Sequence, residues 1–278
     1  AAQAIMRGGS EEQQAKWLPA IAEGAIGTMA LLDNEDWGAT DTSCLLSTKG
    51  NNFALQGKKL LVNDAAVADF FVVLTKYQDS IALVIVETTQ LAKNAISNRT
   101  LVDETKRAAN VDFTGVTIES AAILAKGAEI LPDVRLIGAL LIAAEATGCA
   151  AAALDTVVDY LTTRKQFGRL IGSYQSLKHP TVEILIQMDS ARTLIYHAAT
   201  LIGDGKLSED TEIACRMAKA QAAEALSFAG DRAVQFHGGM GFTYDCDAML
   251  YIRRAQWSQH QYGDPQHHRK LLATLLLD

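Results

Sequence analysis

Residues 160–175 read Tyr-Leu-Thr-Thr-Arg-Lys-Gln-Phe-Gly-Arg-Leu-Ile-Gly-Ser-Tyr-Gln. The stretch ends a long run in which apolar or small residues recur at helical spacing, and it predicts a helix end, a glycine turn at Gly168 and the start of another helix. Arg164 and Lys165 lie where a helix dipole stabilises positive charge. They could equally meet a pyrophosphate, which a planar guanidinium binds through two hydrogen bonds. The residues alone leave both readings open.

A second segment, residues 235–242, reads Gln-Phe-His-Gly-Gly-Met-Gly-Phe. Three glycines in four positions permit either a tight turn or close approach of the backbone to a ligand. The spacing is not that of a dinucleotide-binding fingerprint, and no strand is predicted before it, so a Rossmann fold is excluded.

The two segments together, about seventy residues apart in a helical C-terminal region, resemble the acyl-CoA dehydrogenase family. The Arg-x-x-Phe-Gly turn followed by a Gln, and then Gln-x-x-Gly-Gly-x-Gly-Phe, are the family's C-terminal pattern. Residues 9–19 resemble the end of its first helical domain, and residues 55–59 and 68–69 resemble its β domain. The resemblance implies an α+β fold, with the end of an N-terminal helical domain (1–24), a central antiparallel β domain (25–129) and a C-terminal four-helix-type domain (130–278).

The resemblance also implies FAD as cofactor, an acyl-CoA thioester as substrate and an electron acceptor such as an electron-transfer flavoprotein. It implies a homo- or hetero-oligomer of related subunits, with FAD at a subunit interface. The residues implied to contact the ADP half of FAD are Arg164, Gln166, Phe167, Gln175, Gln235, Gly238 and Gly239.

The family's reaction needs a carboxylate that removes the Cα proton while the flavin takes hydride from Cβ. The family places this Glu at one of two positions, which are Tyr262 and Gly138 in this sequence. Neither residue can act as a carboxylate base. Glu145 and Asp264 are possible substitutes, but Glu145 lies roughly 10 Å further along the helix, and Asp264 suits a helix start. The catalytic residue is left unassigned.

The segment that faces the flavin ring in the family is also changed, since residues 34–41 and 61–63 match it only loosely. The ADP side is thus retained where the ring side is altered. This contrast favours a base-lacking subunit of a heteromer, as in bacterial steroid-type enzymes. The alternatives are a self-sufficient homo-oligomer with a relocated base, and a flavin-free scaffold or acyl-CoA-binding protein.

Elsewhere the chain predicts short strands followed by helices. A hairpin is expected from residues 45–48 and 53–56, strands at 70–74 and 81–86, and a further strand pair marked by Val111, Phe113, Val116 and Ile118. Together they suggest an antiparallel sheet or barrel. Helices are expected after Pro132, from near Pro180 to Ile202 and from Ser208, with two shorter ones at the end; Pro19 predicts a kinked or short helix.

The 278 residues carry a formal net charge of −7, with 49% hydrophobic and 21% charged residues. This balance argues against a broad nucleic-acid or anionic-membrane surface, and no stretch predicts a membrane span. Four scattered cysteines (Cys44, Cys149, Cys215 and Cys246) predict neither disulfides nor a metal site and favour a reducing cytoplasm. The first residues read like the middle of a helix, so further chain is expected before Ala1.

Overall fold

The computed structural model describes residues 1–38 and 41–277, which form two compact units. We call Ala1–Val134 the β unit and Arg135–Asp278 the helical unit. The long helix α3 (Gly127–Thr163) contributes its first turns to the β unit and the rest to the helical unit. The boundary expected at residue 130 therefore falls inside this helix.

The β unit begins with two helices, α1 (Ala2–Gly8) and α2 (Glu11–Ala22). Ser10 caps α2, because its hydroxyl accepts from the Gln13 amide and the Gln13 side chain accepts from the Ser10 amide. Gln13 also donates to the carbonyls of Ala121 and Ile123, which ties α2 to the end of the strand region. The helix continues to Ala22 through Pro19.

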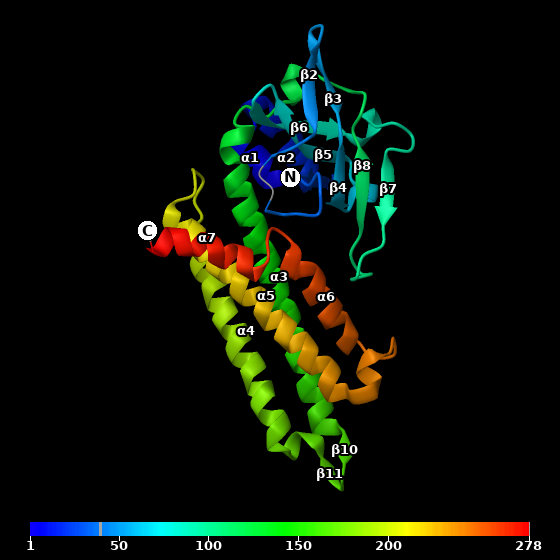
Figure 1. Ribbon diagram of the computed structural model, residues 1–278, viewed down its shortest axis with the longest axis vertical. Coiled ribbons are helices and arrows are strands. Elements are labelled where there is room, and N and C mark those ends of the chain that lie inside the picture. Colours follow the sequence, from blue (N-terminus) through cyan, green and yellow to red (C-terminus); the bar gives the residue numbers. More distant parts are fainter. Residues whose placement is uncertain (39–40, 278) are drawn as a thin grey trace. The chain divides into compact units, whose positions relative to one another are not determined.

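Among the described residues of the β unit, nine strands form two sheets (Figure 1). The larger sheet has the order β1-β5-β2-β3-β9 with β6 also paired to β5, and the smaller has the order β4-β8-β7. The bounds are β1 Gly27–Ala30, β2 Leu45–Lys49, β3 Asn52–Gln56, β4 Lys58–Asn63, β5 Phe70–Tyr77, β6 Ser80–Glu87, β7 Ile96–Arg99, β8 Ala108–Asp112 and β9 Val116–Ile118.

Two strand predictions need correction. The larger sheet is mixed, because β1 and β2 both run parallel to β5 along one of its edges while β6 pairs antiparallel with it. β8 and β9 do not pair with each other: β8 lies between β4 and β7, and β9 pairs with β3. The chain turns at Phe113–Gly115 and crosses from one sheet to the other. The hairpin of β2 and β3 is confirmed.

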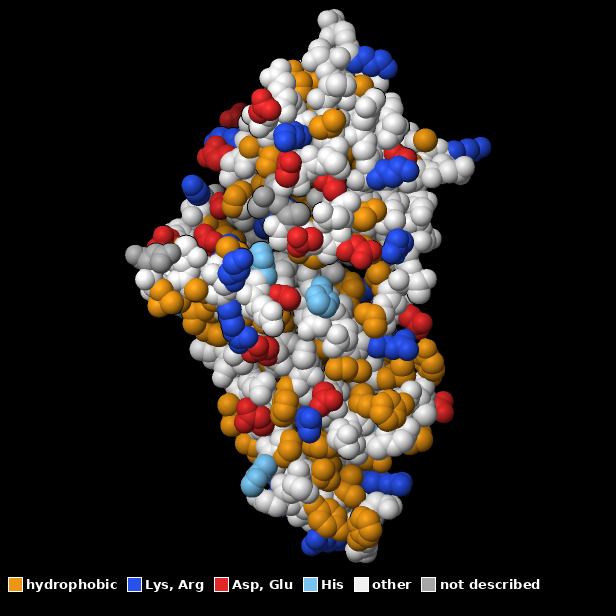
Figure 2. All heavy atoms as spheres, viewed as in Figure 1, with side chains coloured by type: hydrophobic (Ala, Val, Ile, Leu, Met, Phe, Trp, Pro, Cys, Tyr) orange, Lys and Arg blue, Asp and Glu red, His pale blue; other side chains and the backbone are white. Residues whose placement is uncertain are grey.

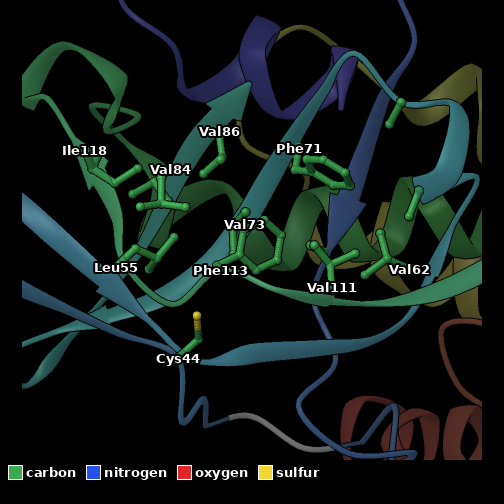
Figure 3. Packing of buried hydrophobic residues seen from close by; sticks show 14 of the residues in the cluster. Cys44, Leu55, Val62, Phe71, Val73, Val84, Val86, Val111, Phe113 and Ile118 are labelled. Atoms are coloured by element: carbon green, nitrogen blue, oxygen red, sulfur yellow. The ribbon is translucent and has the colours of Figure 1, made fainter. Parts of the chain in front are cut away.

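The core of the β unit is formed by side chains from both sheets (Figure 3). Phe71 of β5 meets Phe113 edge to face, with 5.5 Å between ring centroids. Leu55, Val84 and Val111 are fully buried around them. Burial of this apolar surface holds the two sheets together.

The helical unit contains most of α3, together with α4 (Gln175–Leu201), α5 (Glu209–His237), α6 (Ala248–His260) and α7 (Pro265–Leu277). α4 packs along α5, and α6 and α7 also pack on α5 (Figure 1). Alanines dominate the core; the buried ones include Ala143, Ala146, Ala150, Ala222, Ala225 and Ala229. Small side chains let the helix axes approach closely.

Helix α3 starts earlier than the sequence predicted, at Gly127 and not after Pro132. Pro132 is the sixth residue of the helix, where its missing N–H removes only one backbone hydrogen bond. By length and composition α3 could cross a membrane, but half of its most apolar window is buried inside the protein. A core helix of a water-soluble protein gives the same pattern.

Candidate cofactor site

The first part of the site is a tight hairpin after α3. Strands β10 (Lys165–Gln166) and β11 (Arg169–Leu170) pair antiparallel, joined by Phe167 and Gly168. Both joining residues have positive φ, 54° and 78°, as a type I′ turn requires. Glycine adopts this conformation freely, whereas Phe167 adopts it at a steric cost. The residue is nevertheless 91% exposed, so core packing does not explain the presence of its aromatic ring.

The second part of the site is the end of α5. Gly238 ends the helix with φ 59°, and a 3₁₀ turn, η5 (Gly238–Phe242), follows. A Cβ on Gly241 would lie 2.4 Å from the Val234 carbonyl oxygen, so only glycine lets this turn fold back on α5. A Cβ on Gly238 or Gly239 would instead meet no atom within 4 Å. These two glycines therefore leave open space above the backbone.

The two parts meet in one pocket of about 720 Å³ within the helical unit. Five of the seven expected residues line it: Arg164, Gln166, Phe167, Gly238 and Gly239. The other two do not: the Gln175 amide lies 2.6 Å from His179 Nε2, and Gln235 is exposed on α5. α4 begins beside the pocket, where its second and third residues, Ser176 and Leu177, join the lining. The partial positive charge of a helix N-terminus, together with Arg164, favours a phosphate group there.

An aromatic pair that the two motifs do not predict also lines the pocket. Tyr160 stacks on His237, with 4.1 Å between ring centroids. His237 Nδ1 lies 2.8 Å from the Ala233 carbonyl oxygen, so it must donate, and Nε2 is left as an acceptor in the neutral ring. Tyr160 lies one helical turn before Arg164, and this spacing could have identified it.

Two exposed apolar residues, Phe167 and Met240, line the pocket. Figure 2 shows hydrophobic side chains gathered at the end of the helical unit that carries β10 and β11. The exposed large apolar residues of the β10–β11 hairpin are Phe167 and Leu170. Those of η5 and the residues just after it are Met240, Phe242 and Tyr244. The pocket thus combines a cation, open glycine backbone and aromatic surface, which fits an adenine nucleotide bearing a pyrophosphate.

In the β unit, the segment expected to face the flavin ring is held by turns and one buried cation. Asn34 accepts from the Asp36 amide, and Asp36 accepts from the Gly38 amide. Fully buried Lys59 pairs with Asp33 at 2.8 Å and donates to the Thr42 hydroxyl, so it anchors both ends of the segment. Ala39 and Thr40 lie outside the described residues. Within the described chain, no three His, Cys, Asp or Glu side chains are grouped to hold a metal ion.

The two positions at which the family carries its base lie in contact with each other. A Cβ on Gly138 would be 2.5 Å from Tyr262 Cζ, so the tyrosine ring lies directly against the backbone of α3. Burial raises the pKa of the Tyr262 phenol, and the positive charge of Arg135 only partly opposes this. The phenol therefore stays protonated at neutral pH.

The two substitute carboxylates have structural partners. Glu145 Oε1 lies 2.5 Å from Arg254 Nη1, in an ion pair between α3 and α6. Asp264 accepts from the His267 amide and so caps the start of α7. Both arrangements explain the carboxylates without a catalytic role.

Comparison with known proteins defines the class of this protein. The family described as "Acyl-CoA dehydrogenase, C-terminal domain" matches residues 135–277. An acyl-CoA dehydrogenase of Bacillus subtilis is 30% identical over 98% of this chain and 74% of its own length. This chain belongs to the acyl-CoA dehydrogenase family, whose members are FAD-dependent oxidoreductases.

Two more specific similarities were found. Acyl-CoA dehydrogenase IpdE2 of Mycolicibacterium smegmatis is 38% identical, over 46% of this chain and 39% of its own length. The ChsE4–ChsE5 complex of Mycobacterium tuberculosis contains a chain that superposes with a TM-score of 0.86 at 22% identity, covering all of this chain and 74% of the other. The second similarity is one of fold.

Proposed function

We propose that this chain is the base-lacking subunit of a heteromeric, FAD-dependent acyl-CoA dehydrogenase. In this assignment it binds the ADP half of an FAD whose flavin ring lies in a related partner subunit, and an electron-transfer flavoprotein is the class of acceptor expected. The observation that carries the proposal is the contact of Tyr262 with Gly138, which leaves no carboxylate at either base position.

Each pocket residue has a role in holding the nucleotide. Arg164 would neutralise pyrophosphate charge with its two parallel N–H donors. Gly238 and Gly239 would let the phosphates approach the backbone, since a side chain at either position would project into the open space. Tyr160, His237 and Phe167 supply aromatic surface for the adenine.

The chemistry divides between the subunits. FAD, when bound, would supply the acceptor for hydride from the acyl Cβ. The partner subunit supplies the carboxylate that takes the Cα proton. This chain contributes a cation, a helix N-terminus and aromatic surface, and it moves no proton. The existence of a complex between two chains, ChsE4 and ChsE5, in a protein of the same fold supports this division.

The test is the absorbance near 450 nm of the chain purified alone and after co-expression with a related subunit from the same genome. We expect little flavin with the chain alone and about one FAD per pair of subunits in the complex. A yellow protein near full occupancy without a partner would overturn the proposal in favour of a self-sufficient enzyme. A complex that contains no flavin would indicate a flavin-free scaffold.

A further inference from the structure

The loop between α6 and α7 (residues 261–264) presses Tyr262 against helix α3. With ideal geometry, a Cβ on Gly138 would lie 2.5 Å from Cζ and 2.6 Å from Cε1 of the tyrosine ring. Real Cβ contacts are not this short, so the ring occupies the space that any larger side chain at position 138 would need. The Tyr262 ring therefore packs against position 138 only because that residue is glycine.

Lys219 of α5 anchors both the end of α6 and the loop that follows it. Its ammonium group is buried and donates to the carbonyls of Gln259 and Gly263, each at 3.0 Å, on either side of Tyr262. Buried charge-assisted hydrogen bonds of this kind are costly to break. Hydrogen bonds therefore hold the backbone on both sides of Tyr262.

The loop conformation is also fixed by its own backbone. Tyr262 and Gly263 both have positive φ, 58° and 101°. A Cβ on Gly263 would lie 2.4 Å from the His267 ring, so α7 packs tightly against the loop. Holding a tyrosine in the left-handed region costs about 1 kcal/mol or more. The fold maintains this strained conformation with the ring directed at α3.

We infer that Tyr262 is a plug that closes this subunit's own acyl site. It does more than lack a carboxylate: its ring fills the space over Gly138 that a substrate would need at the base position. The acyl thioester of the complex then binds only in the partner subunit. This inference rests on the proposed function for its meaning in the complex, but the plug itself is a property of this chain.

Binding of octanoyl-CoA to the purified full chain, followed by isothermal titration calorimetry, tests the closure. The variant is Tyr262→Gly, which removes the ring and suits the positive φ; Tyr262→Asn is a second variant that tolerates the same backbone. Tyr262→Phe keeps the ring and is the matched control. We expect Gly or Asn to bind octanoyl-CoA at least about tenfold more tightly than the wild type, and Phe to bind like the wild type.

Equal affinities of the wild type and Tyr262→Gly would overturn the inference, and so would an absence of binding by both, because removing the plug would then open no acyl site. Binding by Tyr262→Phe but not by the wild type would assign the effect to the hydroxyl and not to the ring.

A double-mutant cycle tests the contact without any ligand. Gly138→Ala should lower the Tm of the wild-type chain by about 5 °C, because the added methyl meets the ring. In the Tyr262→Gly chain the same change should lower Tm by less than half as much. Equal shifts in both backgrounds would show that the ring does not lie against Gly138. Neither the octanoyl-CoA titration nor the double-mutant cycle depends on FAD. A negative result in either would therefore contradict the closure by Tyr262 without contradicting the proposed function.

Discussion

Lys219 shows how a single buried charge can serve the fold of this protein. Lys219 is 1% exposed, and its two carbonyl partners lie on either side of Tyr262, Gln259 at the end of α6 and Gly263 in the loop that follows. Burial lowers the pKa of the ammonium group to about 8, and the nearby Asp264 only partly opposes the shift. The cost of burying the charge therefore depends on pH.

The sign of that dependence follows from proton binding. In the unfolded chain Lys219 holds its proton up to about pH 10.4, so between pH 8 and pH 10.4 the unfolded state binds more protons and stability rises with pH. We expect the free energy of unfolding of the wild type to rise relative to Lys219→Met by at most about 3 kcal/mol over this window. Urea unfolding at several pH values measures it. Parallel curves for the two proteins would contradict the assignment.

Arg164 is exposed at the pocket, so its removal should affect the cofactor and not the fold. Loss of a charge-assisted contact to pyrophosphate costs about 1.5–3 kcal/mol, or about 10- to 100-fold in FAD affinity. We expect Arg164→Ala in the complex to show this loss with an unchanged Tm of the chain without flavin. Arg192→Ala, another exposed arginine paired on its own helix, is the control and should leave FAD affinity unchanged.

At the scale of elements, the β10–β11 hairpin combines backbone strain with an exposed aromatic ring. Replacing Phe167 by Asn should relieve the strain at φ 54° and leave Tm equal or higher, since 91% of the residue is exposed. The same change should weaken FAD binding of the complex about tenfold, through loss of aromatic surface. Thermal unfolding and a flavin titration measure the two effects. A lower Tm would mean that Phe167 serves the fold.

Elements set by local sequence could be predicted, and those set by distant partners could not. The β2–β3 hairpin follows from its two-residue turn, and α5 begins where Ser208 caps it. The parallel pairing of β1 with β5 depends on segments far apart in the chain, and nothing local signals it. β8 and β9 have the pattern of a hairpin, yet each finds its partner in a different sheet.

The candidate site divides in the same way. The pocket residues were expected from two local motifs, and five of the seven meet in the pocket. Spacing could place Tyr160 beside Arg164, but its stacking on His237 and the packing of Tyr262 against α3 could not be predicted, because each contact joins residues from separate helices or loops. Periodicity places a residue on a helix face but does not identify what lies opposite.

At the scale of the whole molecule, each unit has a hydrophobic core of its own. Phe71→Ala should cost the β unit about 3–5 kcal/mol, because the ring is fully buried between the two sheets. We expect denaturant to unfold the β unit of this variant first, with most of the helical signal at 222 nm retained. Leu226→Ala, in the core of the helical unit, is the matched counterpart and should lower the helical transition. Simultaneous loss of both signals would indicate a single cooperative unit.

The contact between Tyr262 and Gly138 also constrains the order of evolutionary change. Any side chain beyond hydrogen at position 138 collides with the ring, so an ancestor of this chain had glycine on the helix before it acquired tyrosine in the loop. Related sequences should therefore include chains with the glycine and no aromatic residue in the loop. The reverse combination should be absent, and a larger residue at position 138 should appear only after a change in the loop.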